Sequence, residues 1–335
     1  MEAQDRNRYG SLLFRGPGCH GHCSAVLKRE VLARDSLHRG QRTIGRIVEY
    51  HGRGLFHGQE VSIRLRPQPP NTGIQFQRVD LPGSPTIPAG VAYVKDHKRR
   101  ILLAREGAAV EGIEHIMAAV SGLGIDNVLV EITGKEMPAG DGSSLVFVQL
   151  IREAGVVEHK EAPRQIFTLY RTITLENDGA RITAVPYDKG LELSYHMDFG
   201  DRSVLRQSYT LPLNEETFSQ QISSARTFSL SSGVGEFIKL GLGKGVTEEN
   251  CFLINEDGTA STPINKKRAS LRFADEGVRH KLLDMVGDLY LTGMELRARV
   301  TGTRSGHLLN VLLAKKIVEL AEAESSLSRI ADAKV

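Results

Sequence analysis

Residues 272–288 read Arg-Phe-Ala-Asp-Glu-Gly-Val-Arg-His-Lys-Leu-Leu-Asp-Met-Val-Gly-Asp, and the rest of the chain is organised around this stretch. Apolar residues recur at helical spacing from about Gly277 onward, which predicts a helix with one buried side. His280, Asp284 and Asp288 are four residues apart, so they form one polar row on this helix. A solvated helix face is one interpretation of such a row. The apolar neighbours of the acids favour a functional site instead.

The polar row supplies part of a metal site. A neutral imidazole and a carboxylate one helical turn apart match two of the three protein ligands of a catalytic zinc, which keeps a further position for water. The third ligand must come from elsewhere in the chain. His115 is the candidate, because it lies in the first turn of a second expected helix between Gly112 and Gly124. We therefore expect His115, His280 and Asp284 to bind one cation.

The two expected helices have similar surroundings, which predicts two related domains. Alternating strands precede the His115 helix, and a further strand, Asn127–Gly134, follows it. Residues 166–199 contain more alternating stretches, and the His280 helix leads into the strand-like Glu295–Gly302. Each half thus offers strands, a helix with a histidine in its first turn, and a closing strand. The sequence therefore predicts an α+β fold of two similar domains, with the site at their interface.

Changes in composition set the expected limits of these domains. Residues 1–42 are rich in Gly, Arg and His without a sustained period, so we expect a poorly ordered extension. The polar run Glu158–Pro163 resembles a linker. The predicted units are a first domain at 43–163 with a small insert at about 80–110, a second domain at 164–325, and a tail at 326–335.

Composition also limits the class of protein. The 335 residues, 40% hydrophobic and 25% charged, indicate a soluble globular protein. The net charge of +3 is spread along the chain, which indicates no nucleic-acid partner. No apolar stretch approaches the roughly 20 residues of a membrane span, and the N-terminus lacks a secretory signal. Three cysteines make no disulfide framework, and Cys19–Cys23 packs its potential ligands too closely for a structural zinc site. We expect a cytoplasmic monomer.

Groups for proton transfer can be placed around the expected cation. Glu114 precedes a proposed ligand and is the candidate general base, although a surface acid beside a core histidine is the commoner arrangement. His307 follows the closing strand, where Asp288 could hold it protonated as a general acid or oxyanion partner; a histidine in a mobile loop is the alternative. Ser194 offers a hydroxyl to an oxyanion, whereas a lone serine on a strand is usually polar surface.

Several motifs occur in a fixed order along the chain. They are Ile113-Glu-His115, Gly122-Leu-Gly-Ile-Asp-Asn127, Asp141-Gly-Ser143, Ser224-Ala-Arg-Thr-Phe228, Gly241-Leu-Gly-Lys-Gly245 with Asn250, Arg272-Phe-x-Asp-Glu-x-Val-Arg-His-Lys-x-Leu-Asp284, and Ser305-Gly-His307. With them, the chain from about residue 43 to 322 resembles the UDP-3-O-acyl-N-acetylglucosamine deacetylases of lipid A biosynthesis, which are zinc amidases. The long motif that ends at Asp284 is specific to this family.

The resemblance implies a fold, a cofactor and a substrate. The fold is two duplicated two-layer α/β sandwich domains, each with a small insert, and the second insert, here about 225–254, forms an apolar passage for an acyl chain. The cofactor is Zn²⁺, although Fe²⁺ suits the same ligands, and the substrate is a UDP-linked acylated amino sugar. The implied roles are metal ligands His115, His280 and Asp284; general base Glu114; protonated partner His307, oriented by Asp288; oxyanion hydroxyl Ser194; and substrate contacts Lys281 and Tyr195.

The chain departs from the family pattern outside these groups. Gly54-Leu-Phe-His-Gly58 stands where the family usually has Gly-Leu-His-x-Gly, so a histidine contact is lost or displaced. Ile101–Ala104, Pro138–Gly140 and Val246–Glu249 also differ. These changes concern the acyl-chain length and the grip on substrate. Two alternatives stay open: a catalytically altered relative with a binding or regulatory role, and a zinc amidase that acts on a different N-acetyl sugar.

Overall fold

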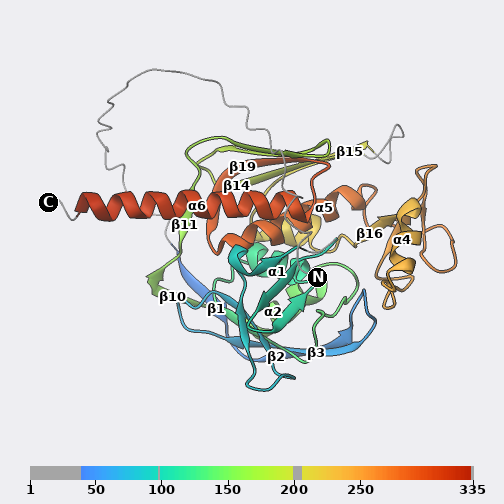
Figure 1. The fold of residues 1–335 in the computed structure, drawn as a ribbon, viewed down its shortest axis with the longest axis horizontal. Coiled ribbons are helices and arrows are strands. Elements are labelled where there is room, and N and C mark those ends of the chain that lie inside the picture. The colour runs from blue at the N-terminus through green and yellow to red at the C-terminus, as the bar shows by residue number, and fades with distance from the viewer. Residues whose placement is uncertain (1–38, 97–98, 199–205, 333–335) are drawn as a thin grey trace, which may run out of the picture.

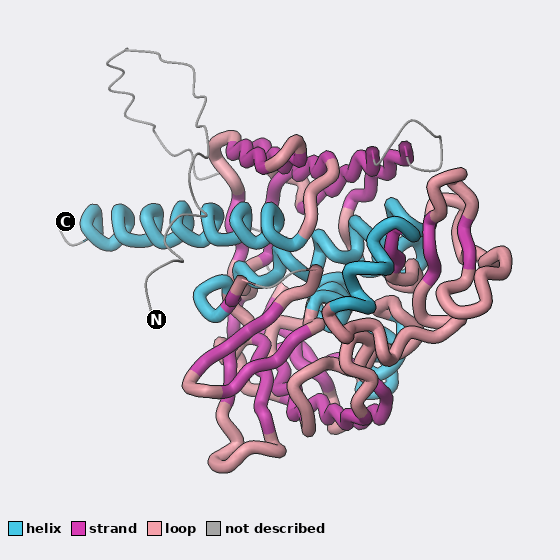
Figure 2. Tube along the Cα trace, turned by 45° about the vertical axis from the view of Figure 1, so that its right-hand side comes forward, coloured by secondary structure: helices cyan, strands magenta, loops and turns pink. Residues whose placement is uncertain are grey.

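The computed structural model describes residues 39–96, 99–198 and 206–332 (Figure 1). Two sheets form its outer layers, and helices lie between them (Figures 1 and 2). The fold is therefore mixed α+β, as predicted. The predicted extension up to residue 38, with its Cys19–Cys23 motif, lies outside the described residues.

The first sheet has the strand order β2-β3-β9-β4-β5. Its strands form because apolar side chains alternate along them: Ile63 and Leu65 of β3 and Phe76 of β4 are fully buried, and the residues between them are not. The strands are β2 (Val48–Arg53), β3 (Glu60–Pro67), β4 (Ile74–Arg78), β5 (Thr86–Pro88) and β9 (Val128–Ile132).

The second sheet repeats this arrangement with the order β12-β13-β19-β14-β15, and β11 (Ile166–Thr168) also pairs with β19. In each sheet one inner pair is parallel, β4 with β9 and β14 with β19, and the other neighbours on these paths are antiparallel. The same order and direction of pairing match the predicted repeat. The strands are β12 (Ile173–Asn177), β13 (Ala180–Pro186), β14 (Leu191–Asp198), β15 (Arg206–Pro212) and β19 (Glu295–Thr303).

Helices from both halves fill the space between the sheets. α2 packs on β2 of the first sheet, and α5 packs on β14 of the second. Within the described ranges, no helix combines the length and the apolar character needed to cross a membrane. The helices are α1 (Glu114–Gly122), α2 (Leu145–Ala154), α3 (Glu215–Thr217), α4 (Val234–Lys239), α5 (Glu276–Leu289) and α6 (His307–Asp332).

The contact between α1 and α5 joins the two halves at the centre of the molecule. A Cβ atom at Gly287 would lie 2.1 Å from the carbonyl oxygen of Glu114 and 3.0 Å from the amide nitrogen of Ala118. The two backbones therefore touch, and only glycine permits this spacing. The contact fixes how α1 and α5 present their N-terminal turns to each other.

Two small sheets stand apart from the main ones, in the regions of the predicted inserts. One contains β6 (Val94–Lys95), β7 (Leu102–Arg105) and β8 (Ala108–Glu111); the other contains β16 (Phe228–Leu230), β17 (Phe252–Ile254) and β18 (Ala260–Ser261). We refer to these regions as the first and second insert. α4 belongs to the second insert and lies at the edge of the molecule (Figure 1). The second insert continues past residue 254, its predicted end.

Two polar segments form strands that were not predicted. The predicted end of the extension at residue 42 falls inside β1 (Gly40–Ile44), and the expected linker Glu158–Pro163 lies in β10 (Val156–Pro163), which pairs with β1. Both strands carry polar side chains, so they lack the apolar alternation that reveals a strand. Gln41 and Thr43 are nevertheless buried, because Asn127 donates to the Gln41 side chain at 3.0 Å and accepts from Thr43 through its carbonyl at 2.7 Å.

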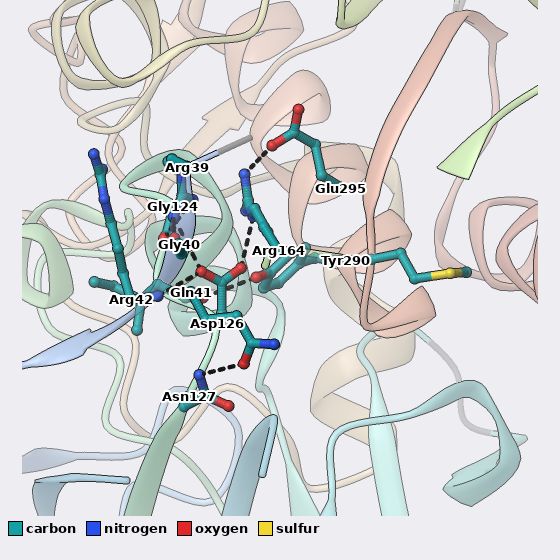
Figure 3. Close-up of polar contacts among 12 residues, drawn as sticks. Arg39, Gly40, Gln41, Arg42, Gly124, Asp126, Asn127, Arg164, Tyr290 and Glu295 are labelled. Atoms are coloured by element: carbon teal, nitrogen blue, oxygen red, sulfur yellow. Dashed lines mark hydrogen bonds and ion pairs between the residues drawn. The ribbon is translucent and has the colours of Figure 1, made fainter. Parts of the chain in front are cut away.

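A polar cluster at Asp126 ties the first half to the second (Figure 3). Arg164 donates from Nε to Asp126 Oδ1 at 2.6 Å and pairs through Nη1 with Glu295, at the start of β19. Beside it, the Tyr290 hydroxyl, just after α5, donates to the carbonyl of Ile125 at 2.8 Å. The side chains of Asp126, Arg164 and Tyr290 are largely buried, so the cluster is shielded from water. It fastens the loop after α1 to the end of α5.

We expect Gly287→Ala to lower the free energy of unfolding by about 1–3 kcal/mol, because the new methyl group overpacks the contact between α1 and α5. Gly235→Ala in α4 is the control, since that helical position is exposed and a Cβ there meets nothing within 4 Å. Alanine at position 235 should be neutral or stabilising by up to about 1 kcal/mol. Urea unfolding of both variants measures the difference. A Gly287→Ala protein as stable as the parent would show that the helices separate without cost.

Candidate metal centre and active site

Three potential ligands converge between α1 and α5. The Nε2 atoms of His280 and His115 lie 3.3 Å and 3.9 Å from Asp284 Oδ1, and the ligand atoms of the three residues all lie within 4.8 Å of one another. The Nδ1 atom of His280 is 3.0 Å from the carbonyl oxygen of Ala225. Nδ1–H therefore donates to that carbonyl, and the Nε2 lone pair faces the other two ligands. The three residues predicted to share a cation are thus brought together from both halves.

The charges of these side chains suit a divalent cation. Burial lowers the pKa of His280 to about 4 and also lowers the pKa of His115, so both imidazoles are neutral at pH 7. Burial alone would raise the pKa of Asp284, but His280 and Lys281 hold it well below its usual range. The Lys281 ammonium donates to Asp284 Oδ2 at 2.6 Å. Two neutral imidazoles and one carboxylate form a donor set that accommodates Zn²⁺ or Fe²⁺.

Glu114 lies in the first turn of α1, next to His115. Only 6% of this residue is exposed, and its Oε2 accepts a hydrogen bond from the backbone amide of Ile101 at 3.1 Å. Burial raises the pKa of the carboxyl group to about 7. Glu114 can therefore both accept and release a proton near neutral pH, as the predicted general base requires.

His307 begins α6 and faces Asp288 of α5. Its Nδ1 lies 2.8 Å from Asp288 Oδ2, and Asn310 donates to the same oxygen at 2.9 Å. Burial alone would lower the pKa of His307, but the Asp288 carboxylate raises it to about 10. The imidazole is therefore protonated at pH 7, with its Nε2–H directed away from Asp288. This is the pairing of His307 with Asp288 that the sequence predicted.

Ser194 and Tyr195 do not reach the cavity, and their predicted contacts there are wrong. Both lie on β14, where alternate side chains face opposite sides of the sheet. Ser194 Oγ is on the outer side, 2.9 Å from Thr210 Oγ1. Tyr195 faces the core, is 1% exposed, and donates its hydroxyl hydrogen to the carbonyl of Ser305 at 2.5 Å. Tyr195 instead supports the turn before His307.

Thr227 and Phe228 line the cavity and were not predicted as site residues. The Phe228 ring lies edge-on to His280 at 6.2 Å between centroids, and Lys281 Nζ is 5.6 Å from its centre. Lys281 also lines the cavity, so its predicted contact with substrate stays a prediction. The motif Ser224–Phe228 could have identified Thr227 and Phe228 as site residues. It ends at Phe228, the first residue of β16.

A cavity of about 860 Å³ connects the metal ligands to an apolar wall. Glu114, His115, His280, Asp284 and His307 lie at its polar end. The second insert supplies much of the apolar lining. The cavity therefore combines a polar reaction centre with space for a hydrocarbon group. Its apolar residues include Leu55, Phe56, Met137, Leu230, Val234, Phe237, Ile238, Leu242, Val246, Leu253 and Ile264.

The chain matches known proteins over most of its length. Residues 41–319 match the family described as UDP-3-O-acyl N-acetylglycosamine deacetylase. Three similar proteins are named UDP-3-O-acyl-N-acetylglucosamine deacetylase. The one from Chlamydia pneumoniae is 38% identical over 288 residues, which cover 85% of this chain and 99% of that protein.

The other two give a similar degree of identity. The protein from Myxococcus xanthus is 37% identical over 83% of this chain and 86% of its own length. The protein from Psychrobacter cryohalolentis is 35% identical over 89% of each chain. A family match over more than half of the sequence, together with relatives matched over nearly their whole length, shows that this chain belongs to the UDP-3-O-acyl N-acetylglycosamine deacetylase family.

Proposed function

We propose that this protein hydrolyses the N-acetyl group of UDP-3-O-acyl-N-acetylglucosamine, a step of lipid A biosynthesis, and releases acetate and the free amine. The names of its relatives support this substrate. The observation that carries the proposal is the convergence of His115, His280 and Asp284 beside Glu114 and the protonated His307. The apolar lining of the same cavity suits the acyl group of such a substrate.

His115, His280 and Asp284 would hold Zn²⁺, or Fe²⁺, which the same donor set suits. Such a cation supplies Lewis-acid chemistry: it polarises the amide carbonyl and makes a nearby water more acidic. The hydrogen bond from His280 Nδ1 to the carbonyl of Ala225 keeps Nε2 available as a ligand. Lys281 keeps Asp284 ionised and so preserves the charge that a cation requires.

Glu114 and His307 divide the proton transfers in this scheme. The Glu114 carboxylate takes a proton from the water that attacks the acetyl carbon. His307 donates from Nε2 to the oxygen that becomes negative, and Asp288 holds the ring in position through Nδ1. The leaving amine then takes its proton from Glu114 or from His307. Thr227 lines the cavity and offers a hydroxyl in place of Ser194, and Phe228 offers an aromatic surface for the sugar in place of Tyr195.

We expect Glu114→Gln to lower kcat by about 10²–10⁴, because the amide cannot accept the proton from water. The variant keeps the shape of the side chain, so it should retain a full equivalent of metal. Acetate release and metal content measure the two properties. Glu176→Gln is the control, since Glu176 is exposed on β12 and pairs only with Arg181 among the contacts that the structure describes. Unchanged turnover in Glu114→Gln would contradict the assigned base. Cellular function that stays intact in Glu114→Ala would indicate the alternative of a binding or regulatory role.

Removal of the metal should abolish acetate release, and added Zn²⁺ should restore it. We expect His280→Ala and Asp284→Ala to bind metal at least tenfold more weakly than the parent, because each removes one of three ligands. His51→Ala is the control, since His51 lies on β2 and contacts Ser62 rather than the cavity. Elemental analysis after dialysis measures bound metal. Full metal occupancy in both ligand variants would contradict the assigned site.

The value of kcat/KM should fall on the alkaline side as His307 loses its proton. The raised pKa of about 10 means that the protonated form is present below that pH and is lost above it. A bound cation would move this limb to a lower pH, because positive charge disfavours the imidazolium. His307→Gln should lower kcat/KM by about 10²–10⁴ and remove the limb. A limb that persists unchanged in this variant would assign it to another group.

A further inference from the structure

Two phenylalanine rings and two guanidinium groups meet at the wall of the cavity. The rings of Phe56 and Phe237 are stacked, with 6.5 Å between centroids and 14° between planes. The Arg100 guanidinium lies 4.3 Å from the centre of Phe56, and that of Arg99 lies 4.5 Å from the centre of Phe237. We call these four residues the aryl–arginine cluster. A guanidinium over a ring face is an attractive contact that restrains the ring.

The aryl–arginine cluster joins parts of the chain that are far apart in sequence. Phe56 belongs to the turn after β2, Arg99 and Arg100 to the first insert, and Phe237 to α4 of the second insert. The backbone amide of Lys244 donates to the carbonyl of Phe56 at 3.1 Å. The turn and the second insert are therefore in direct backbone contact next to the cluster.

At this contact the backbones of the turn and of the second insert are too close to slide past each other. The amide of Gly245 donates to the carbonyl of Leu55 at 3.0 Å, and a Cβ atom at Gly245 would lie 1.9 Å from the carbonyl oxygen of Gly54. On its other side, Phe56 donates its amide hydrogen to Glu136 Oε1 at 2.5 Å. The backbone of Phe56 is thus held from both sides, and the Arg100 guanidinium over its ring restrains the side chain.

Ion pairs hold the two guanidinium groups. Arg100 is 4% exposed and pairs with the fully buried Glu111 at 3.0 Å. Arg99 pairs with Glu236 of α4 at 3.0 Å. A hydrocarbon chain that displaced Arg100 would separate a buried charge from its partner, which is costly. The pair of Arg99 with Glu236 is about half exposed and adds a weaker restraint. The cluster is therefore a closed part of the wall.

The same wall faces an apolar part of the cavity. Val234, Phe237 and Ile238 lie three and four residues apart on α4, so they share one face, and all three line the cavity. Phe56, in the turn after β2 of the first half, also lines the cavity. Ile238 is 70% exposed and Ile264 is 61% exposed, so the outer part of the cavity presents apolar surface to water. A bound hydrocarbon chain would cover them.

We propose that Phe56 and Phe237 determine the length of the acyl chain that this protein accepts. The inference rests on the proposed function and concerns a residue, Phe56, that stands where the family pattern usually has a histidine. The two ring faces occupy space that a longer chain would need, and the held backbone and paired arginines prevent the rings from giving way. Chains that end before the rings bury all their methylene groups; longer ones must leave methylene groups in water.

The test compares kcat/KM for UDP-3-O-acyl-N-acetylglucosamines whose acyl chains lengthen stepwise. In the parent enzyme kcat/KM should rise with length and then stop rising at the point where the chain meets the rings. In Phe237→Ala and Phe56→Ala that limit should move to longer chains, with a gain of about fourfold for each additional methylene group that becomes buried. Phe237 lies on a surface helix, so Phe237→Ala tests the idea even where Phe56→Ala does not fold.

Two control variants separate chain length from general damage. Phe237→Tyr keeps the aromatic ring and should keep the parent length limit. Arg105→Gln removes the guanidinium that lies 5.7 Å from the Tyr93 ring in the first insert, away from the cavity lining, and should also leave the limit unchanged. A purely structural role for the rings would instead lower kcat/KM by the same factor for every chain length.

Binding to Glu114→Gln provides a readout that does not need turnover. Calorimetry with the same series should give the same length limit in Kd, and Glu114→Gln/Phe237→Ala should shift it to longer chains. Absence of acetate release by the parent enzyme would reject the proposed function but leave this binding test in force. Identical length limits in the parent, Phe56→Ala and Phe237→Ala would overturn the inference.

Discussion

The direct contact between α1 and α5 is the constraint on which the site depends. Gly287 lets the two helices approach until their backbones touch, and this brings His115 within reach of Asp284 and His280. Each helix comes from a different half, and each half has its own sheet as a scaffold. The site therefore requires a short distance between the two helices and a fixed orientation of each helix about its own axis. Two rigid sheets hold this geometry better than flexible loops would.

The surroundings of each side chain, rather than its residue type, set the protonation of the polar groups in the cavity. Two histidines at similar depth have opposite states: burial lowers the pKa of His280 to about 4, whereas the carboxylate of Asp288 raises that of His307 to about 10. Glu114 has no cationic partner at hydrogen-bonding distance among its described contacts, so burial raises its pKa to about 7. A neutral imidazole, a protonated imidazole and a carboxyl group that titrates near pH 7 thus arise from only two kinds of side chain.

The sequence predicted α5, the convergence of His115, His280 and Asp284, and the pairing of His307 with Asp288. Helical spacing made this possible, because it fixes which residues share a face. The predictions that depended on strands were wrong or incomplete. Ser194 and Tyr195 alternate to opposite sides of β14, and neither side opens on the cavity. Thr227 and Phe228 reach it because the second insert brings β16 back to the site, which no local pattern reveals. β1 and β10 were missed because their pairing depends on buried polar groups such as Gln41 rather than on apolar alternation.

The division of the three ligands between the halves has a thermodynamic consequence. Neither half holds a complete set, so a bound cation acts as a further cross-link between them, alongside the cluster around Asp126. Ligand binding and domain docking are then linked equilibria: the ion would stabilise the docked arrangement by the same free energy by which docking strengthens the binding of the ion. The affinity of this site for a cation would therefore also depend on residues between the halves that the ion never touches.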